Sequence, residues 1–555
     1  MSAVSASVKI RPMPGFKKAW YKKLNWVGAA TLLVLLLVWE MLDQMGVITY
    51  DFIPAPSEIL VGARGLVSEG APQSALAHTA GVALLGWAIA CVIGLAIGVA
   101  LGLSKTAWSW TAATIEVLRS FPSITFVPLA VLLFGFSSKM ELVVVIYAAT
   151  WQVLVNTLEG VRTVSPGLRE TAKTFGLSKM REVTAIVLPA AASKILVGLK
   201  LGLNLALILS VAAEVVGNPA GLGYGLIVEQ NALRPARMFV YFISVGVLGI
   251  ILNAILQLII QYVLPGITAA SERGATKLMP QVTSTENHEA RNASKSAKTA
   301  KPEKKRKSGN NVPLRGLTPL LAGLLLWRLF GTDDSAFFPR PSTWWTQLVE
   351  LSSDGTLWPA LGATLRSLLI SLTVATVIGS ILGILVGASK FLDRALGPTL
   401  EFFRATPSSA MVPIGVLLMG YTLTMKTSLT VLAAIWPILL NTRSAMREFN
   451  QTLLEVAAVF KMSWFRKART IIMPSVATSI LLGIRVGAPV AIIVTLLVEI
   501  LTGVTGIGAL LAQSQQEYNS AATFGLLVLI GVVALLFNFC IAGIESFFTR
   551  HLPRR

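Results

Sequence analysis

The residues best placed to do chemistry lie in two polar segments that interrupt long apolar runs. RETAKTFGLSKMREVTAIVLP places Glu170 19 positions before Pro189, and LEVAAVFKMSWFRKARTIIMP places Glu455 19 positions before Pro474. Each segment predicts an amphipathic helix that opens on the Glu, a turn, and a second basic helix that enters the membrane at the Pro. Glu favours a helix N-terminus, and Gly176 is placed to end the first helix. The same 19-residue spacing in both segments predicts one repeated feature rather than two unrelated loops.

Catalytic and metal-binding chemistry is not expected elsewhere. His78, His288 and His551 form no ligand cluster, and Cys91 and Cys540 lie in apolar runs without CxxC or metal spacing. The sequence holds no G-x-x-x-x-G-K-[ST] motif, since the nearest text, GILVGASK, lacks the spacing that cradles phosphates. We therefore expect no catalytic residue, no metal site and no cofactor in this chain.

The composition indicates a membrane protein. Of 555 residues, 54% are hydrophobic and 13% are charged, and the mean hydropathy is +0.70. A soluble domain carries about twice that share of charged residues. The net charge is +20, but the basic residues lie in tails and loops that flank apolar runs. A nucleic-acid-binding protein needs a basic face on a folded domain, so this class is excluded.

Apolar runs of spanning length predict the fold class. A bilayer needs ~20 mostly apolar residues per helix, and prolines within some runs indicate kinks that are packed inside a bundle. We predict an all-α polytopic membrane protein with about 12 transmembrane helices, and ten as the alternative count. The runs are 26–47, 80–104, 122–136, 139–158, 195–216, 238–264, 315–331, 364–388, 408–421, 424–441, 480–502 and 523–547.

The charges outside these runs predict the orientation. Residues 1–25 hold six basic residues and no acidic one, and positive charge beside a span marks the cytoplasmic side. Residues 271–315 hold eleven Lys or Arg against four Glu and lack an apolar face, which is typical of a disordered cytoplasmic linker. The carboxyl end is basic as well, so each half crosses an even number of times. The predicted domains are a basic tail (1–25), a first membrane domain (26–270), a basic disordered linker (271–314), a second membrane domain (315–549) and a basic tail (550–555).

An internal repeat divides the chain into two homologous six-helix halves. FIPAPSEIL at 52–60 matches FFPRPSTWW at 337–345, and the same offset of 285 pairs residues through both halves without a gap. The matches are in Gly, Pro, Trp, Glu and Arg, which mark backbone and charge constraints. We predict a fused pair in parallel orientation, related by an axis along the membrane normal. Matched pairs include Gly98 and Gly383, Glu116 and Glu401, Arg119 and Arg404, Pro122 and Pro407, and Glu214 and Glu499.

The two polar segments resemble the cytoplasmic loop of ABC importer permeases of the binding-protein-dependent kind. In that family the loop is the coupling element, a helix that lies in a groove of the ATPase subunit. Departures from the pattern are Thr171, Val456, Met473 and Lys461, which replaces the Gly and implies unequal contacts with the two ATPase subunits. The residues assigned to the two coupling loops are Glu170, Ala172, Gly176, Ile186, Leu188 and Pro189, and Glu455, Ala457, Ala458, Lys461, Ile471 and Pro474.

Other segments resemble the nitrate, taurine, alkanesulfonate and bicarbonate permeases within that family. They are the xPxPS segment before the second span, the runs EVLRSFPSITFVPL and EFFRATPSSAMVPI, and the segments from Glu214 to Gly223 and from Glu499 to Gly508. This resemblance covers nearly all of both halves. It implies a type I ABC importer permease fold in the bacterial plasma (inner) membrane, with both termini cytoplasmic and two usually separate subunits joined.

The resemblance also implies the partners and the cargo. Two ATP-binding subunits on the cytoplasmic side would bind ATP and Mg, and an extracytoplasmic solute-binding protein would deliver the solute. The cargo implied is a small anion such as nitrate, sulfonate or bicarbonate, or a small heterocyclic metabolite. Closure of the ATPase dimer would rock the halves between inward and outward access. Candidate residues of the translocation path are Ser120, Ser123, Thr125, Asn204, Ser210, Thr406, Ser408, Ser409 and Thr495.

Two pairs of charged residues have simpler roles to consider. Arg119 and Arg404 each follow a Glu by three residues, so we predict i,i+3 ion pairs rather than anion ligands. Glu214 and Glu499, near the outer end of the fifth span, either cap a helix or gate the path.

Three other classes remain as alternatives at this point. A secondary transporter of the major facilitator kind also has six plus six spans and a basic linker, but it has no ATPase to dock and so no reason for paired loops. A membrane enzyme would need convergent His, Asp or Glu, and Glu40 and Asp43 near the first span are not kept by the repeat. A channel would need a selectivity ring, which the sequence does not show.

Overall fold

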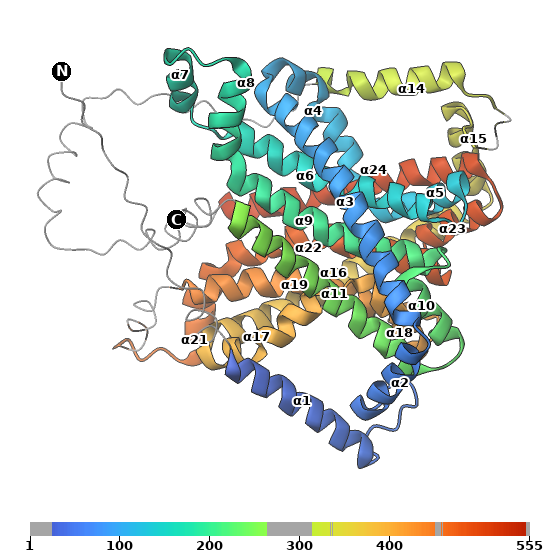
Figure 1. Cartoon of the computed structure of the whole chain (residues 1–555), viewed down its shortest axis with the longest axis vertical. Coiled ribbons are helices and arrows are strands. Elements are labelled where there is room, and N and C mark those ends of the chain that lie inside the picture. Colours follow the sequence, from blue (N-terminus) through green and yellow to red (C-terminus); the bar gives the residue numbers. More distant parts are fainter. Residues whose placement is uncertain are drawn as a thin grey trace, which may run out of the picture.

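The structure, a computed structural model, describes residues 25–263 and 314–550, apart from 334, 336, 450–454, 456 and 458. These residues form two similar helical halves and no strand (Figure 1). The first half contains α1 (Trp26–Gln44), α2 (Pro56–Ser68), α3 (Ala71–Leu103), α4 (Lys105–Ser120), η2 (Ser123–Thr125), α5 (Phe126–Phe134), α6 (Ser138–Arg162), α7 (Pro166–Thr174), α8 (Lys179–Glu182), η3 (Val183–Val187), α9 (Leu188–Val216), α10 (Gly221–Asn231) and α11 (Pro235–Val263).

The second half repeats this order. It contains η4 (Leu314–Leu317), α14 (Thr318–Phe330), α15 (Pro341–Ser353), α16 (Leu357–Ala388), α17 (Lys390–Ala405), η5 (Ser408–Met411), α18 (Val412–Met419), α19 (Leu423–Arg447), α21 (Trp464–Lys467), η6 (Ala468–Ile472), α22 (Met473–Thr502), α23 (Ile507–Gln516) and α24 (Ser520–Arg550). The predicted linker and most of both predicted tails lie outside the described residues.

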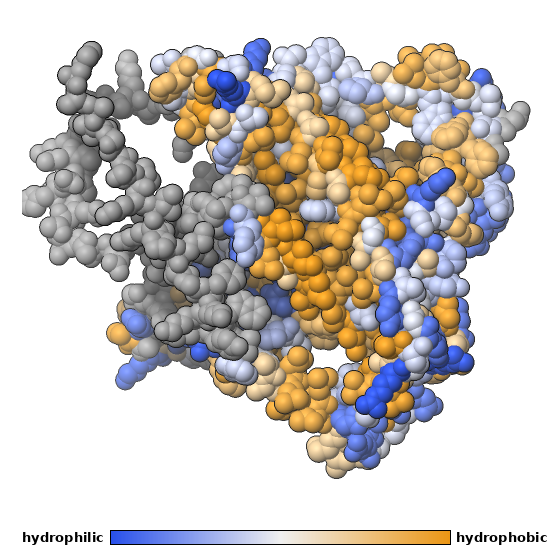
Figure 2. Space-filling model, viewed as in Figure 1, coloured by the Kyte–Doolittle hydropathy of each residue, from blue (hydrophilic) through white to orange (hydrophobic). Residues whose placement is uncertain are grey.

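The outer surface of the bundle is apolar over a wide band. Figure 2 shows this band in orange across the middle of the molecule, with hydrophilic residues gathered at the ends. On α3 the exposed side chains include Leu85, Val92 and Ile97, and on α11 they include Ile251 and Ile255. Helices that are apolar on their exposed faces fit a hydrocarbon solvent, so the predicted all-α polytopic class is confirmed.

Close helix packing forms the centre of each half. Helices α3, α6 and α9 pack together in the first half, and α16, α19 and α22 do so in the second. A Cβ atom added to Gly98 would lie 2.9 Å from the Leu154 carbonyl oxygen, and one added to Gly383 would lie 2.8 Å from that of Leu439. Small residues are therefore needed where these backbones meet.

Two spans are broken rather than straight. Helices α4 and α5 meet at a bend of 74° through η2, and α17 and α18 meet at a bend of 91° through η5. Pro122 and Pro407 stand at the breaks and cannot donate a backbone hydrogen bond. The runs predicted as spans at 122–136 and 408–421 are thus the second arms of these broken spans. Irregular backbone at this depth is tolerated where protein covers it, and here η2 contacts α22 while η5 contacts α9.

The two halves also exchange their first helices. Helix α1 packs on α17 of the second half, where the Asn25 amide donates a 2.6 Å hydrogen bond to the Arg394 carbonyl. In the second half, η4 and α14 pack on α4, and the Thr114 hydroxyl donates a 2.7 Å hydrogen bond to the Gly316 carbonyl. The halves therefore form one interlocked unit.

The described residues include nine helices that are long and apolar enough to span a membrane, or eleven spans if each bent pair counts as one. The predicted span at 315–331 is α14, which has 13 residues. Its length of about 20 Å is short of the ~30 Å hydrocarbon core. The tandem six-helix plan holds, with this helix as its shortest member.

Candidate functional site

The first coupling loop is built by α7, a turn and α8 at one end of the bundle. Gly176 ends the first helix with a left-handed φ of 62°, and the Leu177 amide donates a 3.1 Å bond back to the Ala172 carbonyl. The helix begins at Pro166 instead of at Glu170, so the predicted start was four residues late. Glu170 is exposed, whereas Ala172 is buried.

The second loop has the same backbone geometry. Lys461 replaces the glycine, yet it adopts a left-handed φ of 45°, and the Met462 amide donates a 3.0 Å bond to the Ala457 carbonyl. Glu455 is exposed and Ala457 is buried. Ala458, which the sequence also assigned to this loop, lies outside the described residues.

Large apolar side chains are exposed at equivalent places on both loops. Phe175 is 77% exposed and its repeat partner Phe460 is 75% exposed, while Met180 and its partner Phe465 are 73% and 78% exposed. These residues are separated by the offset of 285. Both loops therefore present an exposed apolar pair at equivalent positions.

Each loop leads directly into a long span. Residues Lys179–Val216 form one continuous helix of 38 residues, which includes α8, η3 and α9, and Phe465–Thr502 forms its counterpart. A π-helical turn lies at the junction in both halves, at η3 and at η6. Pro189 and Pro474 follow these turns inside the continuous helices. A proline cannot donate the helical backbone hydrogen bond, and the π-helical turn just before each proline marks an interruption of the regular α-helical ladder.

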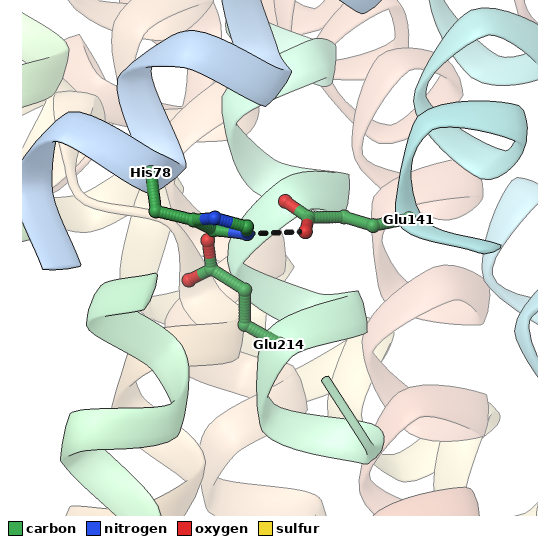
Figure 3. Close-up of side chains that lie close together, drawn as sticks. All are labelled: His78, Glu141 and Glu214. Carbon is green, nitrogen blue, oxygen red and sulfur yellow. Dashed lines mark hydrogen bonds and ion pairs between the residues drawn. The ribbon is translucent and has the colours of Figure 1, made fainter. Parts of the chain in front are cut away.

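The opposite end of the first half holds a buried polar cluster (Figure 3). Glu214 on α9 accepts a 2.7 Å bond from the Thr79 hydroxyl and another of 2.7 Å from the Gly223 amide at the start of α10. Glu141 on α6 accepts bonds from Ser210 and from the Asn218 amide nitrogen, and its Oε2 lies 3.1 Å from His78 Nε2. The sequence predicted no ligand cluster around the histidines, yet side-chain donor atoms of His78, Glu141 and Glu214 lie within 4.8 Å of one another.

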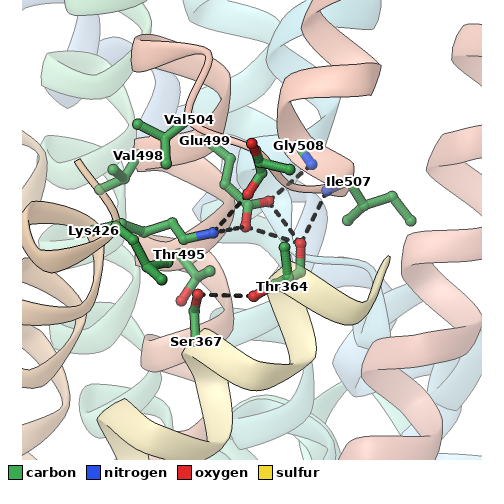
Figure 4. Close-up of polar contacts among 12 residues, drawn as sticks. Thr364, Ser367, Lys426, Thr495, Val498, Glu499, Val504, Ile507 and Gly508 are labelled. Atoms are coloured by element: carbon green, nitrogen blue, oxygen red, sulfur yellow. Dashed lines mark hydrogen bonds and ion pairs between the residues drawn. The ribbon is translucent and has the colours of Figure 1, made fainter. Parts of the chain in front are cut away.

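The equivalent cluster of the second half has a different charge (Figure 4). Glu499 accepts bonds of 2.8 and 3.0 Å from the Thr364 hydroxyl and a 2.9 Å bond from the Gly508 amide, which repeats the Glu214 arrangement. Lys426 occupies the position of Glu141. Its Nζ lies 2.9 Å from Glu499 Oε1 and 2.8 Å from the Thr505 carbonyl oxygen, and both charged side chains are fully buried.

Both glutamates therefore cap a helix, one of the two roles left open by the sequence. Their amide partners are at the starts of α10 and α23, where the first backbone N–H groups lack intrahelical acceptors. The predicted i,i+3 pairs are also confirmed: Arg119 lies 2.7 Å from Glu116, and Arg404 contacts Glu401.

The candidate path residues do not converge on one place. Ser210 belongs to the first cluster and Thr495, which contacts Thr430 at 3.1 Å, lies beside the second. Asn204 is exposed and accepts a 2.7 Å bond from Asn253. The other six candidates lie near the broken spans. Ser123 lies in η2 and Ser408 lies in η5, and the side chains of the other four donate hydrogen bonds to backbone carbonyls. The four are Ser120 to Glu116, Thr125 to Pro122, Thr406 to Phe402, and Ser409 to Ile208 of the other half.

In a comparison with known protein families, both halves of the chain match the same family. Residues 91–269 and 375–553 each match the family described as "Binding-protein-dependent transport system inner membrane component".

Each of the following relatives matches less than half of this chain. A Bacillus subtilis permease named for aliphatic sulfonates is 27% identical over 44% of this chain and 88% of its own length. The nitrate import permease of Synechocystis is 26% identical over 43% of this chain and 88% of its own length. The bicarbonate transport permease of Synechococcus elongatus is 26% identical over 43% and 90%. These matches contradict the major facilitator alternative.

Proposed function

Because the chain belongs to the family of inner membrane components of binding-protein-dependent transport systems, we propose that it supplies two permease domains to one ATP-driven importer. Its two halves take the place of two permease subunits. The loops formed by α7–α8 and by residues 455–467 dock two ATP-binding subunits, which bind ATP and Mg. We place the loops and both termini on the cytoplasmic side of a bacterial inner membrane, with a solute-binding protein on the other side.

The observation that carries this proposal is the pair of exposed apolar side chains on each loop. Phe175 with Met180, and Phe460 with Phe465, are all at least 73% exposed. Aromatic side chains that anchor in a partner's pocket commonly dominate the binding energy of an interface. The same anchors at the same register in both halves fit two related partner surfaces. Lys461 in place of Gly176 makes the two surfaces similar rather than identical.

The long helices supply a route from the loops to the rest of the bundle. A continuous helix of 38 residues is about 57 Å long, so a push on α8 moves the far end of α9 as well. The far end carries Glu214 and meets the second half through η5. Rocking of one half against the other around this seam gives alternating access.

The proposed cargo is a small anion of the nitrate, sulfonate or bicarbonate class. This part of the proposal draws on the names of the relatives, which are assigned to those solutes. In such a system the binding protein outside the membrane supplies most of the selectivity.

The test is co-purification of the tagged chain with its ATP-hydrolysing subunit in mild detergent. The double variant Phe175→Asp with Phe460→Asp should weaken retention of that subunit at least tenfold, on the order of one lost interface anchor. The double variant Glu170→Ala with Glu455→Ala should weaken retention by at least the same factor. Tyr518→Asp is the matched control, since Tyr518 is 78% exposed at the opposite end of the bundle. Retention that is unchanged by the loop variants, or transport driven by an ion gradient without ATP, would refute the proposal.

A further inference from the structure

The two buried clusters differ in charge at two equivalent positions. The offset of 285 places Lys426 at the position of Glu141, and Ala363 at the position of His78. Ser210 and Asn218, the donors to Glu141, are replaced by Thr495 and Gly503. The bonds around the shared glutamate are unchanged, because Thr79 with Glu214 and Thr364 with Glu499 make the same bonds to the following helix. The second cluster can therefore be used as an internal reference for the first.

The reference cluster contains its own positive charge. Glu499 is fully buried and is balanced by the buried ammonium of Lys426 at 2.9 Å. A buried carboxylate without such a partner is strongly unfavourable. The second half is thus electrically neutral at this point.

The first cluster lacks this internal cation. Glu141 is 0% exposed and Glu214 is 1% exposed. Within the described part of the chain, the recorded ion pairs give neither carboxylate a lysine or arginine partner. With both carboxylates ionised and the imidazole neutral, the cluster would carry a charge of −2, which one divalent cation would balance.

The donor set is suited to a transition-metal ion. One imidazole nitrogen and two carboxylates come from α3, α6 and α9, and their donor atoms lie within 4.8 Å of one another. Zinc binds His nitrogen and carboxylate oxygen at about 2.0–2.2 Å. In Figure 3 the three side chains point toward one another from three helices.

The carboxylates are also oriented by neighbouring groups, as metal ligands usually are. Ser210 and Asn218 donate to Glu141, and Thr79 and the Gly223 amide donate to Glu214. The His78 side chain is 22% exposed, whereas the Glu141 side chain is fully buried.

We propose that His78, Glu141 and Glu214 bind one divalent metal ion of the zinc type in the first half only. The ion joins the ends of α3, α6 and α9 that lie farthest from the coupling loops. In the second half, the ammonium group of Lys426 balances the charge of the buried glutamate instead of a metal ion. This inference goes beyond the transport function and does not depend on it.

The experiment uses the full chain in detergent, treated with a chelator and then incubated with zinc chloride alone. After removal of free metal, elemental analysis should find about one zinc per chain. The double variant His78→Ala with Glu141→Lys introduces the residues that the second half has at these two positions, so it should fold. The zinc retained per chain should fall at least tenfold in this variant. Glu159→Lys is the control, because it makes the same charge change at an exposed position of α6 and should keep the zinc.

A second variant guards against a folding defect in the first. His78→Ala alone places the residue found at Ala363 and should weaken zinc binding at least tenfold, while zinc should raise the melting temperature of the wild type but not of this variant. Wild-type protein that retains no zinc would overturn the proposal. Protons bound to the cluster would then neutralise the two carboxylates. Equal zinc in wild type and both variants would overturn it as well, since the ion would then lie elsewhere.

Discussion

The two buried clusters hold a buried glutamate in the same way, but they differ in the charged groups placed beside it. In each, a threonine hydroxyl and a glycine amide hold a buried glutamate at the start of the following helix. The second half adds Lys426 and is neutral, whereas the first half adds Glu141 and His78. The comparison shows that the duplicated fold needs the glutamate in both halves, while its charge partner is free to differ once the halves are fused.

The largest expected effect comes from removing the cation of the second half. Lys426→Met leaves Glu499 buried and unpaired, so the free energy of unfolding should fall by about 3–5 kcal/mol. Unfolding in detergent by denaturant or heat measures the change. Adding Glu499→Gln to the same variant should recover most of the loss, because the uncompensated charge is then gone. A Lys426→Met protein as stable as the wild type would show that Glu499 is not charged in the folded state.

A smaller loss of stability, equal in the two halves, is expected when the threonine that holds each buried glutamate is replaced. Thr79→Val and Thr364→Val each remove a hydroxyl that accepts from a backbone amide and donates to a buried glutamate. Each should lower the free energy of unfolding by about 1–3 kcal/mol. The comparison of the two melting curves is the measurement, and a loss in only one half would mean that the scaffolds are not equivalent.

The smallest effect concerns the two coupling loops. Lys461 holds a left-handed conformation that Gly176 adopts without a side-chain penalty. Lys461→Gly should therefore stabilise its turn by about 1 kcal/mol, and hydrogen exchange at the Met462 amide should slow about fivefold by the same conversion. Gly176→Lys should have the opposite effect at the Leu177 amide. Faster exchange at Met462 in Lys461→Gly would contradict the left-handed turn.

The architecture was largely predictable because it depends on patterns that one sequence contains. Apolar runs located the spans, and the offset of 285 divided the halves without any alignment of relatives. The bends at Pro122 and Pro407 were missed, since an amphipathic helix such as α4 does not look apolar enough to be half of a span. The starting point of α7 was missed because Pro166, a good first helical residue, was given less weight than Glu170.

The buried cluster was not predictable from local sequence. His78 is 63 residues from Glu141 and lies on a different helix, and helix packing alone brings the two together. A signal was nevertheless present in the repeat. Two positions that face the shared glutamate change together, from His78 and Glu141 to Ala363 and Lys426. Paired changes of charge between homologous halves indicate a common environment, even when neither residue belongs to a motif.

The exchange of first helices has a consequence for biosynthesis. Asn25, at the start of α1, bonds to Arg394, which is 369 residues later in the chain. At about 5–20 residues per second, the ribosome needs roughly 20–70 s to make that partner after α1 has been made. In the folded chain, Gly28 of α1 packs against the Pro398 side chain of α17. During this interval that face of α1 has only lipid or insertion machinery beside it. The first half therefore leaves the ribosome as an unfinished unit, and its assembly is completed only when the second half arrives.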